Sequence, residues 1–169
     1  MNKKLVYGLG AVAAALALTG LASAGTATSG KVSLAQTGLG RILVDGRGHT
    51  LYLFAKDTHG RSACNGACAG FWPPLIAAGK PLAGPGVKPA LLGTTRRTDG
   101  RLQVTYHHHP LYTFVKDARR GDTNGEGLNV YGATWYAVSA TGARVVSNTA
   151  ATGDGGYGDG SGNDYGNRY

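Results

Sequence analysis

LYLFAKD at residues 51–57 and LYTFVKD at residues 111–117 are two copies of one segment, 60 positions apart. The match continues upstream, where GRILV at 40–44 aligns with GRLQV at 100–104. Nine of the 18 positions from 40 to 57 are identical in the second copy without a gap. Self-similarity at a fixed spacing indicates a duplicated supersecondary unit.

Each copy has the pattern of a β-hairpin. In the first copy, a short strand at 42–44 is followed by DGRG at 45–48, whose residues favour a turn. The stretch 50–55 is then extended, with Tyr52 and Phe54 on one face and Leu51 and Leu53 on the other. Both faces are apolar, so we expect this strand to be central.

The second copy and the chain that follows it repeat this pattern. We expect strands at 101–105 and 111–115, a turn at 106–109, and further strands at 135–138 and 144–146. The sequence therefore predicts a mainly β protein. Its two tandem hairpin repeats should form a small pseudo-symmetric antiparallel sandwich or barrel, with a short helical turn near Cys64 and Cys68.

The flanking segments define the expected domain organisation. Two lysines, an apolar run and a small-residue site predict a secretory signal peptide, which leaves no transmembrane helix in the mature chain. The tail is rich in Gly, Tyr and Asp, a composition typical of disorder. The expected parts are a signal peptide at 1–24, a flexible segment at 25–37, a β domain at 38–149 with repeats at about 38–97 and 98–149, and a disordered tail at 150–169.

The chain is basic, with 17 Lys and Arg against 9 Asp and Glu. Such a charge favours anionic partners. Export argues against nucleic acid, so we expect anionic cell-envelope polymers as partners. We expect a location outside the cytoplasm: secreted, periplasmic or associated with the envelope. No nucleophile elbow, metalloprotease motif, phosphate loop or dinucleotide fingerprint is present, which argues against an enzyme.

The repeated motif also points to a family. Tyr52-x-Phe54-x-x-Asp57 and its copy at 112–117 resemble the bacterial secreted-repeat proteins, often lipoproteins, defined by a Tyr-x-(Phe/Trp/Tyr)-x-x-Asp motif. CNGACAGFWPPL at 64–75 and GATWY at 132–136 are similar to that family as well. The resemblance implies export and two tandem copies, with no established activity. The chain departs from the family in having no cysteine for lipid attachment and in the three histidines at 107–109.

The motif residues are the first candidate site. The two aspartates could share a proton or a cation across the repeat, or each could cap a turn. The aromatic rings could form a shared core or a stacking surface for a flat ligand. The candidate ligand-binding residues are Tyr52, Phe54, Asp57, Tyr112, Phe114 and Asp117.

The cysteines and histidines are the other candidates. Cys64 and Cys68 are the only cysteines, and in an exported protein they favour a disulfide over a metal pair. His107 and His109 at the hairpin turn, with His49, could hold a transition metal, while the alternative is a polar turn. No other cofactor is expected.

The sequence thus predicts an exported, non-catalytic envelope or extracellular binding module of unknown ligand. A metal- or haem-related accessory protein using the 107–109 turn is the alternative, and an uncharacterised hydrolase is the third hypothesis. A binding site between the repeats requires an open, aromatic-lined cleft; a solidly filled interface counts against it.

Overall fold

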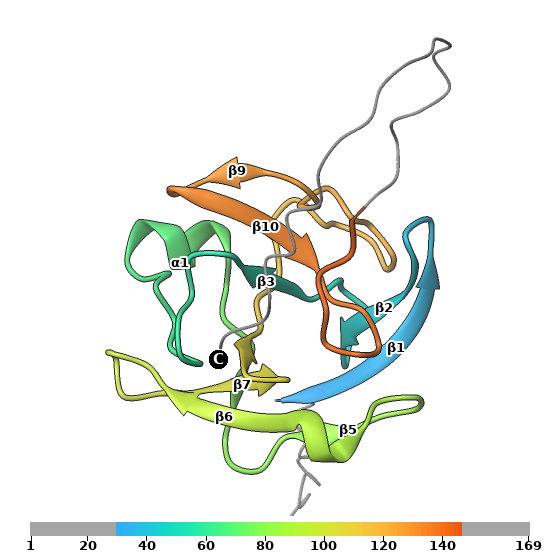
Figure 1. Ribbon diagram of the computed structural model, residues 1–169, viewed down its shortest axis with the longest axis horizontal. Coiled ribbons are helices and arrows are strands. Elements are labelled where there is room, and N and C mark those ends of the chain that lie inside the picture. Colours follow the sequence, from blue (N-terminus) through green and yellow to red (C-terminus); the bar gives the residue numbers. More distant parts are fainter. Residues whose placement is uncertain (1–29, 147–169) are drawn as a thin grey trace, which may run out of the picture.

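The computed structural model describes residues 30–146, which form a mainly β fold of small sheets (Figure 1). Its elements, in chain order, are β1 (Lys31–Thr37), β2 (Gly40–Asp45), β3 (Tyr52–Phe54), α1 (Ala67–Phe71), β4 (Ile76–Ala77), β5 (Leu82–Ala83), the 3₁₀ turn η1 (Pro89–Leu91), β6 (Leu92–Arg96), β7 (Leu102–Tyr106), β8 (His109–Pro110), β9 (Asn129–Val130) and β10 (Ala133–Ala137). The predicted mainly β class and the helical turn beside Cys68 are confirmed.

The strands form sheets with the orders β2-β1-β5, β3-β10-β9 and β4-β7-β6, and β8 pairs with β7. Within the described residues these sheets do not close into a barrel. No helix in the described range is long and apolar enough to span a bilayer. The predicted signal peptide and C-terminal tail lie outside the described residues.

The two repeats are related by a pseudo-two-fold axis. Tyr52 and Tyr112 face each other across it and exchange backbone N–H···O bonds of 2.8 and 3.0 Å. The motif strand of each repeat also pairs with the other repeat. In the first, β3 pairs with β10, which places Phe54 opposite Trp135. The segment 111–115 runs in the same way along residues 71–75 of the first repeat. The repeats are therefore interlocked.

The gap-free alignment of the repeats is one residue out of register in the first strand. Leu51 donates its N–H to the carbonyl of Leu43, and Leu111 donates to Val104, both at 2.9 Å. Leu43 and Val104 are thus equivalent, 61 positions apart. The turn is the cause, because β7 and β8 are joined by a two-residue turn, whereas Asp45 and His49 enclose three residues.

The N-terminal boundary of the repeat also differs from the sequence prediction. Residues 31–37, expected within a flexible segment, form β1, which pairs with β2 from Val32 to Thr37. The equivalent strand of the second repeat is β6, which we had placed at the end of the first repeat. Each unit is therefore a three-stranded element that begins one strand earlier than predicted.

Two predicted strands are only partly formed. Residues 111–115 make isolated bridges, because Pro73 and Pro74 opposite them have no N–H to donate. Residues 144–146 contribute one bridge, between Arg144 and Val138. Between β4 and β6 the chain contains only the short elements β5 and η1.

The two faces of the motif strands enclose two separate cores, because Leu51 and Leu53 point one way and Tyr52 and Phe54 the other. The first core is mostly aliphatic and is built from Val32, Leu43, Leu51, Leu53, Ala77, Val87, Val104, Tyr106, Leu111 and Val138. The second core is mostly aromatic and is built from Ile42, Tyr52, Phe54, Cys64, Cys68, Trp72, Tyr112, Phe114, Trp135 and Ala137.

Candidate functional site

Four aromatic rings form a continuous stack at the centre of the molecule. Trp135 and Trp72 lie face to face with ring centroids 3.8 Å apart. Phe54 stacks on the outer side of Trp135 at 4.1 Å, and Phe114 on the outer side of Trp72 at 4.3 Å. The order of ring types is therefore the same from either end of the stack, as the pseudo-two-fold axis requires.

The motif tyrosines reach across the axis to the motif aspartates. The Tyr52 hydroxyl donates to Asp117 Oδ2 at 2.7 Å, and the Tyr112 hydroxyl donates to Asp57 Oδ2 at 2.8 Å. The other oxygen of each carboxylate accepts a backbone N–H, from Ala63 on Asp57 and from Asn124 on Asp117. Each aspartate is thus both a turn cap and a bond between the repeats.

Burial governs the protonation of this network. Loss of solvent raises the pKa of Asp57 to about 6, against the lowering effect of the Ala63 N–H and the Tyr112 hydroxyl. Burial also raises the pKa of Asp117. The pKa values of Tyr52 and Tyr112 are raised, first by burial and then by the neighbouring carboxylates. Both phenols are therefore neutral donors.

The six motif residues fill the interface between the repeats. The rings of Tyr52, Phe54, Tyr112 and Phe114 are 0–7 % exposed, and Trp72 and Trp135 are fully buried. The loop at Gly125 covers the stack so closely that a Cβ there would lie 2.8 Å from Trp72 and 2.9 Å from Tyr52. A ligand cannot reach these rings in this conformation, so the interface between the repeats is a filled core.

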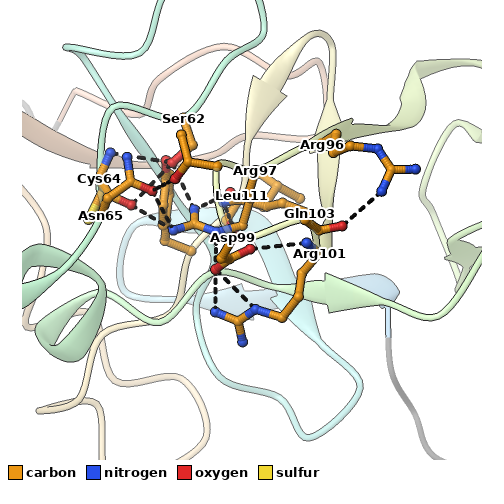
Figure 2. Close-up of polar contacts among 12 residues, drawn as sticks. Ser62, Cys64, Asn65, Arg96, Arg97, Asp99, Arg101, Gln103 and Leu111 are labelled. Carbon is orange, nitrogen blue, oxygen red and sulfur yellow. Dashed lines mark hydrogen bonds and ion pairs between the residues drawn. The ribbon is translucent and has the colours of Figure 1, made fainter.

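A buried arginine fixes the segment that leads into the aromatic core (Figure 2). The Arg97 guanidinium donates to Gln103 Oε1 and Ser62 Oγ, to the Cys64 carbonyl and to Asn65 Oδ1 at 2.7–3.0 Å. Its Nε also pairs with Asp99. In the sequence, the one signal for this residue is the adjacent basic pair Arg96 and Arg97, which does not predict burial.

The predicted disulfide is present in the same segment. Cys64 and Cys68 are bonded, with their Cα atoms 5.3 Å apart. The bond closes a short loop that leads into α1. Trp72 follows α1, and its N–H donates to the Cys68 carbonyl at 2.8 Å. Disulfide and arginine together hold Trp72 in place for the ring stack.

The histidines do not converge. His107 and His108 form the two-residue turn between β7 and β8, both with positive φ, and the His107 ring lies 6.5 Å from that of His109. His49 instead faces Asp45, with Nδ1 at 3.4 Å from Oδ2. Within residues 30–146 no three His, Cys, Asp or Glu side chains lie close enough together to hold one metal ion.

A shallow hollow of about 330 Å³ opens on the outer side of β1 and β2. Its lining includes Ser33, Gln36, the glycines of the 45–48 turn, and Arg120. Arg120 packs directly over Gly48, and the Gly121 N–H donates to the Gly48 carbonyl at 3.3 Å. Arg47 and Arg119 adjoin these lining residues in sequence, so we name this feature the arginine-rimmed hollow.

The described residues carry an excess of positive charge. Residues 30–146 contain 14 Lys and Arg and 6 Asp and Glu. Every one of those carboxylates accepts a hydrogen bond from the protein itself: Asp45, Asp57, Asp99, Asp117, Asp122 and Glu126. In the same range, only Arg97 and Arg101 among the Lys and Arg form ion pairs, both with Asp99. The remaining cations have no carboxylate partner there.

Comparison with known proteins identifies the repeat. A family model described as a secreted repeat of unknown function matches twice, at residues 33–76 and 93–139. Both matches begin in the first strand of a unit, in agreement with the boundaries at β1 and β6. No curated protein and no solved structure matches the chain. The two matches cover more than half of the chain, and the protein therefore belongs to this family of secreted repeats.

Proposed function

We propose that the protein is an exported, non-catalytic module that binds an anionic polymer of the cell envelope at the arginine-rimmed hollow. The observation that carries the proposal is the excess of Lys and Arg over Asp and Glu in the described residues. All six carboxylates of the described residues accept hydrogen bonds from the protein, whereas Arg47, Arg119 and Arg120 are exposed and form no ion pair within the described residues. Arg120 lines the hollow, and Arg47 and Arg119 are next to lining residues in sequence. A phosphodiester polymer offers the regularly spaced anions that guanidinium groups bind in bidentate fashion.

The hollow is also suited in shape to a polymer. It is open and shallow, so a chain can lie across it without threading into the protein. The Asp45 carboxylate, which lines it, is occupied by the N–H groups of Arg47 and His49 at 2.8 and 2.9 Å. These bonds do not remove the Asp45 charge, so the binding of an anion depends on the arginines that line and adjoin the hollow.

The test is titration with soluble inorganic polyphosphate over a range of salt concentrations. The triple variant Arg47→Gln, Arg119→Gln, Arg120→Gln should lose about tenfold or more in affinity, since each cation near an anionic surface contributes about 1 kcal/mol. The matched control is Arg61→Gln, Lys88→Gln, Arg96→Gln, which removes the same charge from exposed positions outside the hollow.

The control triple should lose only about threefold, because its charges act through screened long-range attraction. Equal losses in the two triples would reject the hollow as the site. Absence of polyphosphate binding by the unaltered protein at low salt would reject the proposed function itself.

A further inference from the structure

An exposed apolar surface lies at the end of α1 and the β9–β10 turn, and we name it the aromatic patch. It consists of Phe71, Val115, Val130 and Tyr131, which are 39–50 % exposed. The rings of Phe71 and Tyr131 lie 6.3 Å apart, and the Val115 N–H donates to the Phe71 carbonyl at 3.2 Å. Side chains from three separate segments therefore meet at one surface.

Both aromatic side chains are held in fixed positions. Phe71 is the last residue of α1, in the segment fixed by the Cys64–Cys68 bond and by Arg97 (Figure 2). Tyr131 has φ 61°, a left-handed conformation that costs free energy in a residue other than glycine. The two-residue turn between β9 and β10 has positive φ at both of its residues, and this turn sets the position of the Tyr131 side chain.

The pseudo-symmetry supplies an internal comparison. Val115 bonds to Phe71 in the second motif segment, and Ala55 bonds in the same way to the Thr134 carbonyl at 3.0 Å in the first. The same backbone arrangement thus forms with a small and a polar residue in place of Val115 and Phe71. The fold does not require these exposed apolar side chains, so their presence needs another reason.

Two lysines border the patch. Lys56 Nζ lies 3.5 Å from the Tyr131 carbonyl, and Lys116 follows Val115 directly. Both lysines are exposed and neither pairs with a carboxylate within the described residues. The neighbouring carboxylates of Asp57 and Asp117 are turned into the tyrosine network. The surface is therefore aromatic and cationic at once.

We propose that the aromatic patch docks on an anionic lipid bilayer, with Phe71 and Tyr131 entering the headgroup region and Lys56 and Lys116 contacting lipid phosphates. Amphipathic tyrosine rings and long lysine stems both suit this interface. A sugar platform fits less well, because the two rings are tilted by 42° and share no stacking plane. This inference goes beyond the proposed function, since the patch is at the α1 and β9 side of the molecule and the hollow at the β1–β2 side (Figure 1).

The test is co-sedimentation of the whole protein with phosphatidylglycerol vesicles and with phosphatidylcholine vesicles. The double variant Phe71→Ser, Tyr131→Asn removes both rings, and asparagine tolerates the positive φ at 131. It should bind phosphatidylglycerol vesicles about tenfold more weakly. The matched control is Leu82→Ser, which removes a 58 % exposed apolar side chain outside the patch and should bind normally.

A second variant tests the charge contribution. Lys56→Gln, Lys116→Gln should weaken binding to phosphatidylglycerol vesicles about tenfold and leave the weaker binding to phosphatidylcholine unchanged. The inference is overturned if the aromatic variant sediments like the unaltered protein, or if Leu82→Ser weakens binding as much. Polyphosphate affinity separates the two proposals: it should survive the aromatic variant and fall in the Arg47, Arg119, Arg120 triple.

Discussion

Asp57 and Asp117 hold equivalent positions, but their tyrosines have different second partners. The Tyr112 hydroxyl also lies 2.8 Å from Ser62 Oγ, which can accept a hydrogen bond from it. The Tyr52 hydroxyl instead accepts the Gly125 N–H at 3.2 Å, so Asp117 is its one acceptor among the contacts formed in the described residues. The pseudo-symmetry of the backbone is therefore not a symmetry of side-chain energetics.

We predict that Asp117→Asn destabilises the protein more than Asp57→Asn does. In Asp117→Asn, the single amide oxygen cannot accept from both the Tyr52 hydroxyl and the Asn124 N–H, so one donor loses its acceptor at a cost of about 2 kcal/mol. In Asp57→Asn, the oxygen can accept from the Ala63 N–H while Tyr112 turns to Ser62, at a cost of about 1 kcal/mol or less. Urea denaturation of the two variants at the same pH measures both losses. Equal losses would show that Ser62 does not substitute for Asp57.

The raised pKa of Asp57 predicts a pH dependence of stability. Because its pKa of about 6 in the fold exceeds the unfolded value, Asp57 contributes stability that is complete below about pH 4 and lost as the pH rises through 6. Asp57→Asn should therefore flatten the change in unfolding free energy between pH 5 and 7.5 by about 1–2 kcal/mol.

The measurement is the difference between Asp57→Asn and the unaltered protein across that pH range. The comparison is needed because burial lowers the pKa of His109, which titrates with the opposite effect on stability. A parallel pair of pH profiles would contradict the prediction.

We predict that His108→Gly stabilises the β7–β8 hairpin. His108 has φ 66°, where glycine avoids a steric cost of about 1 kcal/mol. The midpoint of urea denaturation should rise accordingly. His49→Gly is the control, because His49 does not have a positive φ and the substitution only adds freedom to the unfolded chain. A fall in the midpoint for His108→Gly would mean that the ring contributes contacts outweighing the strain.

At the scale of elements, the segment from Ser62 to Phe71 has little regular structure of its own. Its one helix has five residues and no side-chain cap. Its conformation depends instead on two constraints, the Cys64–Cys68 disulfide and the hydrogen bonds from Arg97. Arg97 comes from the turn after β6. This turn therefore supports a segment more than 30 residues earlier in the chain.

We predict that Arg97→Met loosens this segment. The variant leaves Gln103 Oε1 without its donor and removes one of the two donors from Asn65 Oδ1 and from the Cys64 carbonyl, at a cost of about 3 kcal/mol. The Cys64–Cys68 bond should also become faster to reduce with dithiothreitol, because the loop opens more often. Arg96→Met is the control: Arg96 is exposed with one bond to the Gly100 carbonyl, and its loss should cost less than about 0.5 kcal/mol. Unchanged reduction kinetics would show that the disulfide loop is rigid without Arg97.

Some strands could be predicted from the sequence and others could not. The alternation of Tyr52 and Phe54 with Leu51 and Leu53 predicted the two-faced motif strand correctly, because period-two patterns follow directly from strand geometry. The same alternation at Val32 and Leu34 was overlooked, which displaced the start of each repeat by a strand. The prolines at 73 and 74 signalled an irregular segment but not the strand they would weaken.

The site residues show where sequence reasoning ends. Identical spacing placed Asp57 and Asp117 in matching positions, yet their swapped bonds to Tyr112 and Tyr52 depend on how the repeats interlock, which no local pattern encodes. Arg97 was invisible for the same reason, because its partners are distant in sequence. The metal and ligand-binding roles of the sequence candidates remain predictions.

At the scale of the whole molecule, neither repeat has a complete core. Both tryptophan–phenylalanine stacks join a tryptophan of one unit to a phenylalanine of the other, and the two tryptophans stack on each other across the units. We therefore predict that a chain divided between Gly79 and Lys80, an exposed site, yields two halves that are unfolded separately. Mixed together, they should recover the β-sheet circular dichroism of the intact protein. A cooperatively folded single half would contradict the interlocked core.

The stacked indoles give the molecule a built-in optical reporter. Trp72 and Trp135 are the chain's only tryptophans, and their rings are parallel to within 3°. Electronic transitions in chromophores this close couple as an exciton, so absorption and emission from either one depend on its twin. Replacing one indole should abolish a shared spectral band rather than halve it, and that band records directly whether the two units are seated together.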